Sequence, residues 1–218
     1  VAALTQAVEK VQSQNDWVAT SELRERLALA RYQLQQCLDD ANETSDWHLL
    51  TPEGPVALDP HANSSPLTQA ADLCYPETPL IRNETLNRAE VSSQGAKARR
   101  HLLLAMLESE HLQNLGLEGY GPEVAMYNAV LGQTKMHRLD RRHSRFAVRP
   151  PAEGSLVPAW EIVFDRILAA TDRRISIADI HAALRVPPIG MKQGPIPVLV
   201  TAVLLFTGDE VALYEHGT

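Results

Sequence analysis

Cysteine is scarce in this sequence, and so are aromatic residues and long apolar runs. Cys37 and Cys74 are the two cysteines, too few for a disulfide framework and without the spacing of a zinc site. No apolar run approaches the roughly 20 residues that a membrane-spanning helix needs. The N-terminus also lacks a charged start followed by a hydrophobic signal core. We therefore expect a cytoplasmic protein with no membrane partner.

The signatures of common catalytic sites are missing as well. The glycines of LGLEGYG are not followed by Gly-Lys-Ser or Gly-Lys-Thr, which excludes a phosphate loop in this stretch. There is no nucleophile elbow and no zincin histidine pair, and His48 and His61 have no Cys or carboxylate at ligand spacing. We expect no catalytic residues, no metal and no cofactor. A hydrolase that uses Glu84 or Glu123 is a third alternative for the function, behind the two given below.

Length and hydropathy set the scale of the fold. A chain of 218 residues with 44% apolar residues holds one large domain or two small ones. We expect a mainly α fold, with a helical N-terminal unit over 1–149 that contains a minor β element, followed by a winged-helix-like domain over 150–218. Because the sequence begins at Val1 without a methionine, we expect it to be a piece of a longer polypeptide.

The N-terminal part is dominated by one long predicted helix, at about 21–41, with Ser21 as its N-cap. Its apolar residues recur at helical spacing and form a narrow stripe: Leu23, Leu27, Ala30, Leu34, Cys37 and Leu38. A stripe of this width suits a bundle helix, one arm of a helical hairpin or a short coiled coil. The composition at about 44–66 shifts to Ser, Thr, Asn, Asp, Pro and Gly, which predicts turns around a short strand.

Helices are predicted over about 67–134, and the first part of this range contains a polar cluster. This polar cluster consists of Arg82, Asn83, Glu84, Asn87 and Arg88. On a helix, Glu84 and Arg88 are four residues apart and can pair. The polar cluster is either a binding site or a hydrogen-bonded joint between elements. A later helix begins at Ser92 or Ser93 and exposes Lys97, Arg99 and Arg100, and another begins near Pro122.

A basic segment over 135–149 interrupts an otherwise acidic chain. Its six bases are opposed by Asp140 alone, which gives +5, so the rest of the chain carries −12 of the total of −7. The bases are Lys135, Arg138, Arg141, Arg142, Arg145 and Arg149. A basic strip of this kind binds nucleic-acid phosphates or forms a solvated linker between two folded units. We expect a linker, with nucleic-acid binding as the alternative.

The C-terminal part follows the element order of a winged helix: helix, short strand, helix, loop, helix, strand and turn. Its third helix runs from about Pro195 to Thr207, is apolar nearly all round, and has Gly208 as its C-cap. This helix offers no charged residue to a DNA groove. From 150 to 218 there are eight acids and five bases, a net charge of −3 that repels phosphates. The domain therefore fits protein docking better than groove reading.

Four stretches together resemble a segment of very large bacterial P-loop ATPases, which include the ATPase of phage-exclusion (BREX) defence systems and uncharacterised ATP-binding relatives. The stretches are CYPETPLIRNETLNR, SSQGAKARRHLLLAML, LGLEGYGPEVAMYNAVL and PPIGMKQGPIPVLVTAVLLFTGDEVALYEHGT, and the resemblance covers about 67–218. It implies a non-catalytic region outside the ATPase core, in which helices and a winged helix serve a DNA-dependent or multiprotein machine. The Walker motif of such a parent is absent from this sequence.

Two functions follow as expectations. The first is a non-catalytic interaction or regulatory module of a large intracellular bacterial ATPase, with phage defence as one context. Its partners would be other domains of that ATPase or separate proteins. The second is a DNA-binding module that acts through the basic segment. A further hypothesis is that Arg82 or Arg88 reaches a phosphate on a neighbouring ATPase domain.

Overall fold

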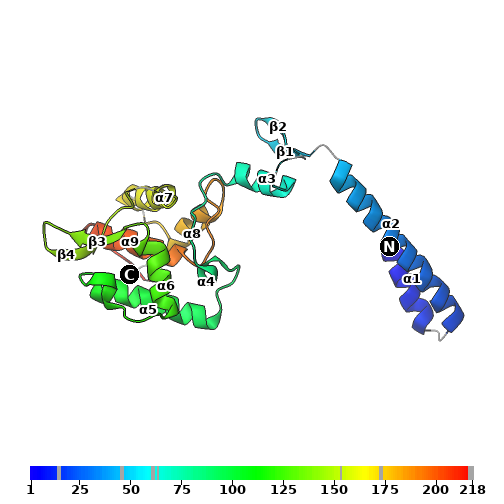
Figure 1. Cartoon of the computed structure of the whole chain (residues 1–218), viewed down its shortest axis with the longest axis horizontal. Helices are drawn as coiled ribbons and strands as arrows, with labels where there is room; N and C mark the ends of the chain where they lie inside the picture. The colour runs from blue at the N-terminus through cyan, green and yellow to red at the C-terminus, as the bar shows by residue number, and fades with distance from the viewer. Residues whose placement is uncertain are drawn as a thin grey trace. The chain divides into compact units, whose positions relative to one another are not determined.

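The computed structural model shows a mainly helical chain with two small antiparallel hairpins (Figure 1), which confirms the predicted mainly α class. It describes residues 1–13, 16–44, 47–59, 62, 64–152, 154–171 and 174–215. His61, one of the two histidines weighed as a metal ligand, lies outside this set. The chain divides into two compact units, Val1–Ala71 and Asp72–Thr218, and each is described by itself.

The first unit begins with a helical hairpin. Helix α1 (Ala2–Ser13) packs against α2 (Trp17–Thr44), with Val8 and Leu27 buried at their contact. The predicted long helix is confirmed in kind, but it begins at Trp17 and not at Ser21. Its start is set by Asp16, whose carboxylate accepts a hydrogen bond from the Ala19 amide at 3.1 Å, as an N-cap does.

A two-stranded hairpin follows in the region predicted to hold turns and a short strand. Strands β1 (His48–Thr51) and β2 (Gly54–Ala57) pair antiparallel, with His48 opposite Ala57. Leu58 comes directly after β2 and is buried, and its amide donates to the Trp47 carbonyl at 2.8 Å. Helix α3 (Pro66–Cys74) then leads into the second unit.

The second unit is built around one apolar helix, α9. Its elements in chain order are α4 (Glu84–Asn87), α5 (Ser93–Ser109), η1 (Gln113–Gly116), α6 (Pro122–Tyr127), η2 (Asn128–Gly132), β3 (His137–Asp140), β4 (Arg145–Val148), α7 (Val157–Leu168), η3 (Ala169–Thr171), α8 (Ile177–Arg185), α9 (Ile196–Thr207) and η4 (Gly208–Glu210). Helices α5 and α7 and strand β4 all contact α9, and Figure 1 shows α9 between α5 and α7. The predicted caps Ser92 and Ser176 accept hydrogen bonds from Gly95 and Asp179.

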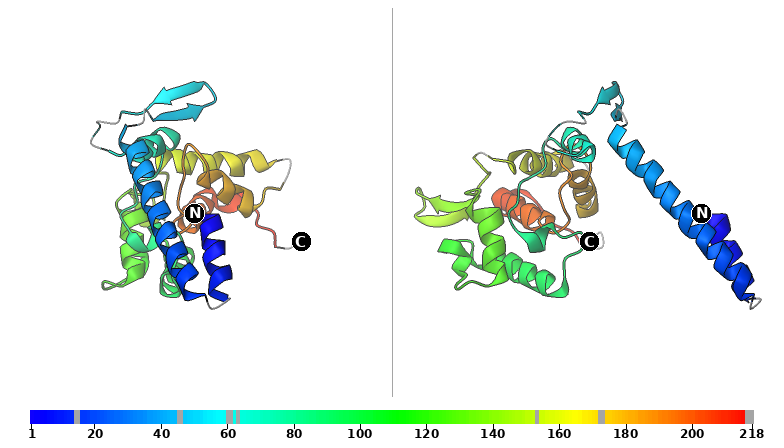
Figure 2. Two further views of the ribbon diagram at one scale, coloured as in Figure 1. Left: turned by 90° about the vertical axis from the view of Figure 1, so that its right-hand side faces the viewer. Right: turned by 45° about the vertical axis from the view of Figure 1, so that its right-hand side comes forward.

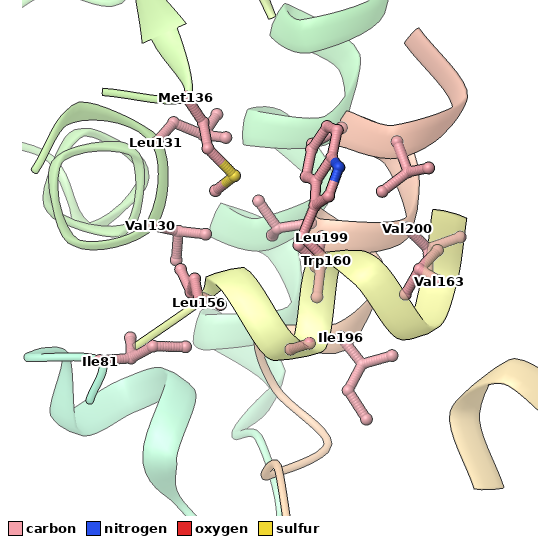
Figure 3. Close-up of a cluster of buried hydrophobic side chains, with 14 of the residues drawn as sticks. Ile81, Val130, Leu131, Met136, Leu156, Trp160, Val163, Ile196, Leu199 and Val200 are labelled. Atoms are coloured by element: carbon pink, nitrogen blue, oxygen red, sulfur yellow. The ribbon is translucent and has the colours of Figure 1, made fainter. Parts of the chain in front are cut away.

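The core of this unit gathers side chains from distant parts of the sequence around α9. Figure 3 shows Leu199 and Val200 of α9 beside Trp160 and Val163 of α7. Seven of the twelve residues of α9 are buried, so the prediction that this helix is covered on more than one face is confirmed. Gly208 ends the helix at φ 53°, a conformation that glycine adopts at low cost.

The loop before α9 is held against the segment that precedes α5. The Glu77 amide donates to the Pro188 carbonyl at 3.2 Å, and Arg99 Nη1 of α5 donates to the Gly194 carbonyl at 3.0 Å. A Cβ on Gly194 would lie 2.1 Å from the Leu86 carbonyl oxygen, so the two backbones approach as closely as glycine permits. Arg99, predicted to be exposed, is half-buried because its guanidinium reaches this loop.

The prediction that 135–149 is a linker is wrong, because this segment forms a β-hairpin. Strands β3 and β4 occupy most of that range and pair with each other, and the base of β4 packs on α9. The many arginines suggested a solvent-exposed linker. The charge of a segment does not predict whether its backbone pairs with itself, as it does here between β3 and β4. The chain divides between Ala71 and Asp72, and not at the predicted boundary after Arg149.

The C-terminal strand of the expected winged helix is not present among the described residues. Residues 211–215, which follow α9 and η4, are irregular, and residues 216–218 lie outside the described set. Ile175, expected in a short strand, is irregular as well. The helices α7, α8 and α9 do occur in the predicted order and at the predicted places.

Candidate nucleic-acid interface

The basic segment forms a β-hairpin with its arginines gathered at the turn. Asp140 of β3 is opposite Arg145 of β4, and the four residues between them, 141–144, make the turn. Ser144 closes the turn at φ 50°, in the left-handed region. Arg141 and Arg142 lie in this turn and Arg145 opens the return strand, so three arginines occur within five residues at the end of the hairpin.

The base of the hairpin is fixed by a buried histidine. His137 is 5% exposed; its Nδ1 lies 2.9 Å from the Tyr127 hydroxyl and its Nε2 lies 2.7 Å from the Glu110 carbonyl oxygen. A carbonyl only accepts, so Nε2 carries the proton and Nδ1 accepts from the Tyr127 hydroxyl. Burial lowers the pKa of His137, and the nearby Glu110 opposes this shift only in part. The ring is therefore neutral at pH 7.

A second contact ties the return strand to the same place. The Glu110 carboxylate accepts a hydrogen bond from the Val148 amide at 2.7 Å. The Phe146 amide donates to the His111 carbonyl at 3.2 Å, and its ring lies 5.4 Å from the His137 ring. Both strands are thus fastened to the end of α5, which makes the hairpin a rigid extension of the core.

Asp140, the acidic residue of the hairpin, is hydrogen-bonded to groups of the hairpin itself. Asp140 accepts hydrogen bonds from the Arg142 amide at 2.9 Å, from His143 Nδ1 at 3.0 Å and from Arg149 Nη2 at 2.5 Å. These hydrogen bonds, that from His143 first, hold the pKa of Asp140 well below its usual range. The carboxylate stays charged and pairs with Arg149, so it does not cancel the arginines at the turn.

The six predicted phosphate-binding residues therefore separate into two kinds. Arg149 pairs with Asp140, and Arg138 Nη1 donates to the Lys135 and Pro150 carbonyls at 2.7 and 3.0 Å. The other four are exposed, and the described part of the chain gives them no ion pair and no side-chain hydrogen bond: Lys135, Arg141, Arg142 and Arg145. Cationic side chains of this kind bind phosphate oxygens, and the guanidinium group of arginine can do so with two parallel hydrogen bonds.

The polar cluster is bonded mainly to its own backbone. Asn83 is the N-cap of α4 and accepts from the Leu86 amide at 3.0 Å, while Asn87 Nδ2 donates to the Ile81 carbonyl at 2.6 Å. Glu84 and Arg88 pair at 2.9 Å, both largely exposed, as their spacing predicted. These contacts favour the joint over the binding site. Arg82 is exposed beside them.

Two open cavities are described in the second unit, away from Glu84 and Glu123. These cavities, of about 470 and 480 Å³, lie between α7 and α8, and neither is lined by either acid. Within the described residues, no group of three or more His, Cys, Asp or Glu side chains has a metal-binding arrangement. No helix in this part of the chain is long and apolar enough to cross a membrane.

Two contacts were not predicted from the sequence. One is the pair of hydrogen bonds from His137 to Tyr127 and to the Glu110 carbonyl, and the other is the hydrogen bond from Arg99 to the Gly194 carbonyl. One weak signal was present: RFAV contains two strand-forming residues, Phe146 and Val148, and follows a polar stretch. The partners Tyr127 and Glu110 carry no local signal, because they are 10 and 27 residues away from His137. No protein-family model, curated protein or solved structure matches this chain.

Proposed function

We propose that this chain is a non-catalytic interaction module and that its β3–β4 hairpin contacts the phosphate backbone of nucleic acid. The observation that carries the proposal is the group of exposed arginines, Arg141, Arg142 and Arg145, on a hairpin whose base is fixed by buried hydrogen bonds. A rigid support lowers the entropy lost when the arginines engage a phosphate. The nearest acid, Asp140, already has Arg149 as its partner.

The distribution of charge supports contact by the hairpin turn. The segment 135–149 carries +5 while the rest of the chain carries −12. A polyanion is therefore attracted to one place and repelled elsewhere, which orients the encounter. Arginines at a turn contact phosphates without a fixed base partner, so we expect little sequence preference.

The setting we propose is a large intracellular bacterial P-loop ATPase, of the kind that the four quoted stretches resemble, with phage defence as one context. In this setting α7, α8 and α9 form a winged-helix-like domain. Their order and the burial of the third helix support this interpretation. Because α9 is covered on most sides, we propose that this domain supports the hairpin and docks to protein, and does not read a DNA groove.

Docking to other domains of the parent ATPase is the second function, and the surface between α7 and α8 favours it. The two open cavities there are neighbours that share Arg166, Ala183 and Val186 in their linings. Ile162, Ala169 and Pro187 add apolar lining, whereas Asp165 and Arg166 supply charge. Mixed linings of this kind are usual where domains of one protein meet.

The test is binding of a fluorescent DNA duplex and a single strand to the 218-residue chain at about 50 and 200 mM salt. If three phosphate contacts form, affinity for the duplex falls about 40-fold over this range, and that for the single strand about 20-fold. Changing Arg141, Arg142 and Arg145 to Gln should abolish binding and its salt dependence. The matched control changes three other exposed arginines, Arg24, Arg26 and Arg31, to Gln and so removes the same charge.

Two outcomes would overturn the proposal for the hairpin. One is no binding at about 50 mM salt, where phosphate contacts are strongest. The other is an equal loss in the control variant, since this would assign the binding to net charge and not to the turn. Either result would leave protein docking as the function to pursue.

A further inference from the structure

Two segments of the second unit, far apart in the sequence, contain bases and no acid. They are residues 91–107, which include most of α5, and residues 180–207, which run from α8 to the end of α9. Their bases are Lys97, Arg99, Arg100, Arg185 and Lys192. The two segments meet in the fold, because α5 contacts α9 and Arg99 donates to the Gly194 carbonyl. Positive charge therefore gathers there, within a chain that has 27 acids against 20 bases.

Helix α8 presents two basic side chains on one face. His181 and Arg185 are four residues apart, so they lie one turn apart on the same side of the helix. His181 is half-buried and Arg185 is exposed. Asp179 is two residues before His181 and so lies on a different face, where it lines a cavity beside α7. The acid of this helix is thus turned away from its two bases.

The loop 186–195, which joins α8 to α9 (Figure 2), brings Arg99 of α5 to this face. The loop is bonded to α8 by the Met191 amide, which donates to the Leu184 carbonyl at 2.8 Å, and to Arg99 through Gly194. Burial lowers the pKa of His181, and the positive charges of Arg99 and Arg185 lower it further. Three side chains from two helices therefore act on one another, and we call them the cationic cluster: Arg99, His181 and Arg185.

The ion pairs of the described residues include no member of the cationic cluster. Two acids belong to the segment that packs on the same loop. Glu84 pairs with Arg88, and Glu77 contacts the loop through its amide, which donates to the Pro188 carbonyl. The charges that shift the pKa of His181 are those of the two arginines. Like charges held together by the fold repel one another, and an anion bound among them turns this repulsion into attraction.

We propose that the cationic cluster binds the phosphate group of a small molecule, such as a nucleotide. A guanidinium group forms two parallel hydrogen bonds with a phosphate, and an imidazolium adds a further donor. Arg99 gives Nη1 to the loop and has other N–H groups for a ligand. A tetrahedral phosphate accepts hydrogen bonds from several directions, which suits donors that come from two helices.

The charge of the whole chain favours a small ligand over a strand. One phosphate group contacts the cationic cluster alone, whereas a long polyanion extends beyond it over a chain of net charge −7. The proposal does not rest on the hairpin, whose arginines belong to a different part of this unit. The two proposals therefore stand or fall separately.

The first test follows His181 by NMR over pH 5–8. Its Cε1–H resonance is assigned by its loss in His181→Gln and is titrated in inorganic phosphate and in sodium chloride of equal ionic strength. A bound anion favours the imidazolium, so phosphate should raise the pKa of His181 more than chloride, which only screens the two arginines. Equal pKa values in the two salts would overturn the proposal.

The second test measures phosphate affinity of variants from the amide resonances of α8. Arg185→Gln should weaken binding at least about tenfold, because a charge-assisted hydrogen bond is lost. Arg185 is exposed, so this change should leave the fold intact, whereas Arg99 also tethers the loop and is kept. His181→Gln should weaken binding at pH 6 and do so less at pH 8, where the native imidazole is neutral.

The matched control is Lys97→Gln, which removes one positive charge from the same acid-free segment. Lys97 is exposed and lies two residues before Arg99, on a different face of α5. It should leave phosphate affinity unchanged. An equal loss in Lys97→Gln and Arg185→Gln would assign the binding to net charge and refute the site.

Competition identifies what carries the phosphate. Tighter binding of ADP than of inorganic phosphate, by at least about tenfold, would assign a nucleotide, and equal affinity would assign recognition of the phosphate group alone. Single-stranded DNA is added to a chain in which Arg141, Arg142 and Arg145 are changed to Gln, so that the hairpin turn does not contribute. Displacement of phosphate by this strand more readily than by ADP would overturn the assignment to a small molecule.

Discussion

Replacing Gly194 by alanine should destabilise the second unit strongly, because there is no room for one methyl group. A Cβ at this position would lie 2.1 Å from the Leu86 carbonyl oxygen and 2.8 Å from its carbonyl carbon, both backbone atoms. Leu86 is fully buried, and the loop is tethered by Arg99. Neither side can move without breaking core contacts, so we expect a loss near the upper end of the overpacking range, about 2–3 kcal/mol.

The assay is denaturant unfolding followed by the fluorescence of Trp160, which is 4% exposed in the core of this unit. Trp17 and Trp47 are changed to Phe so that the signal reports the second unit alone. In thermal unfolding the same loss lowers the midpoint by about 4–12 °C for a unit of this size. The result bears on the whole fold, because this loop joins α4, α5 and α9.

The matched control is Gly132→Ala. Gly132 has no positive φ, and its added Cβ would meet the end of the flexible Asn128 side chain at 3.3 Å and Tyr127 atoms at ordinary contact distances of 3.6 and 3.8 Å. It lies in a helix, where alanine is favoured over glycine by about 0.5–1 kcal/mol. We expect unchanged or slightly raised stability. If Gly194→Ala unfolds at the same denaturant concentration as the parent, the close approach to Leu86 does not constrain the fold and the reasoning is refuted.

Three further predictions concern the hairpin and the polar cluster. Because the native pKa of His137 lies below its ordinary value of 6.5, the unfolded chain takes up the proton first, so the free energy of unfolding should fall as pH drops below 6.5; His137→Gln should remove this part of the slope, as measured by unfolding across pH 5–8. Because its hydrogen bonds lower the pKa of Asp140, Asp140→Asn should lower the free energy of unfolding at pH 7 and make that free energy fall less as the pH drops below the ordinary carboxyl pKa of about 4, as unfolding across pH measures. The same change frees Arg149 and removes a negative charge, so it should strengthen DNA binding at low salt, as a binding series measures. Asn83→Ala should cost about 1 kcal/mol as a lost N-cap, whereas Glu84→Ala should cost under about 0.5 kcal/mol because its ion pair is exposed, and equal losses in unfolding would contradict the joint.

The helices were predictable because their signals are local. Ser92 and Ser176 cap the helices that follow them, and Gly208 ends α9 where its freedom of φ is needed. Apolar residues nearly all round α9 placed it in the core before its neighbours were known. The start of α2 was misplaced because Ser21 and Asp16 are both capping residues, and the sequence does not rank them.

The hairpin was not predicted because the features that hold it are spread along the chain. His137 looks like one more ionisable residue of a basic run, yet it is neutral and buried, and its two partners come from α6 and from the end of α5. Proximity of that kind exists only after the helices have packed. The same holds for Arg99, which belongs to a basic patch by sequence and to the core loop by structure.

The sequence predicted the candidate site as a set of six basic residues, and the fold decides which of them are available to bind a phosphate. Net charge treats all six bases of 135–149 alike, but Arg138 and Arg149 are held by the carbonyls and carboxylate of their own hairpin. A bond that already exists must be broken before such an arginine binds a phosphate, so those two contribute less than Arg141, Arg142 and Arg145. Asp140 has the opposite role from the one its charge suggests, since it orders the turn through the Arg142 amide and occupies Arg149.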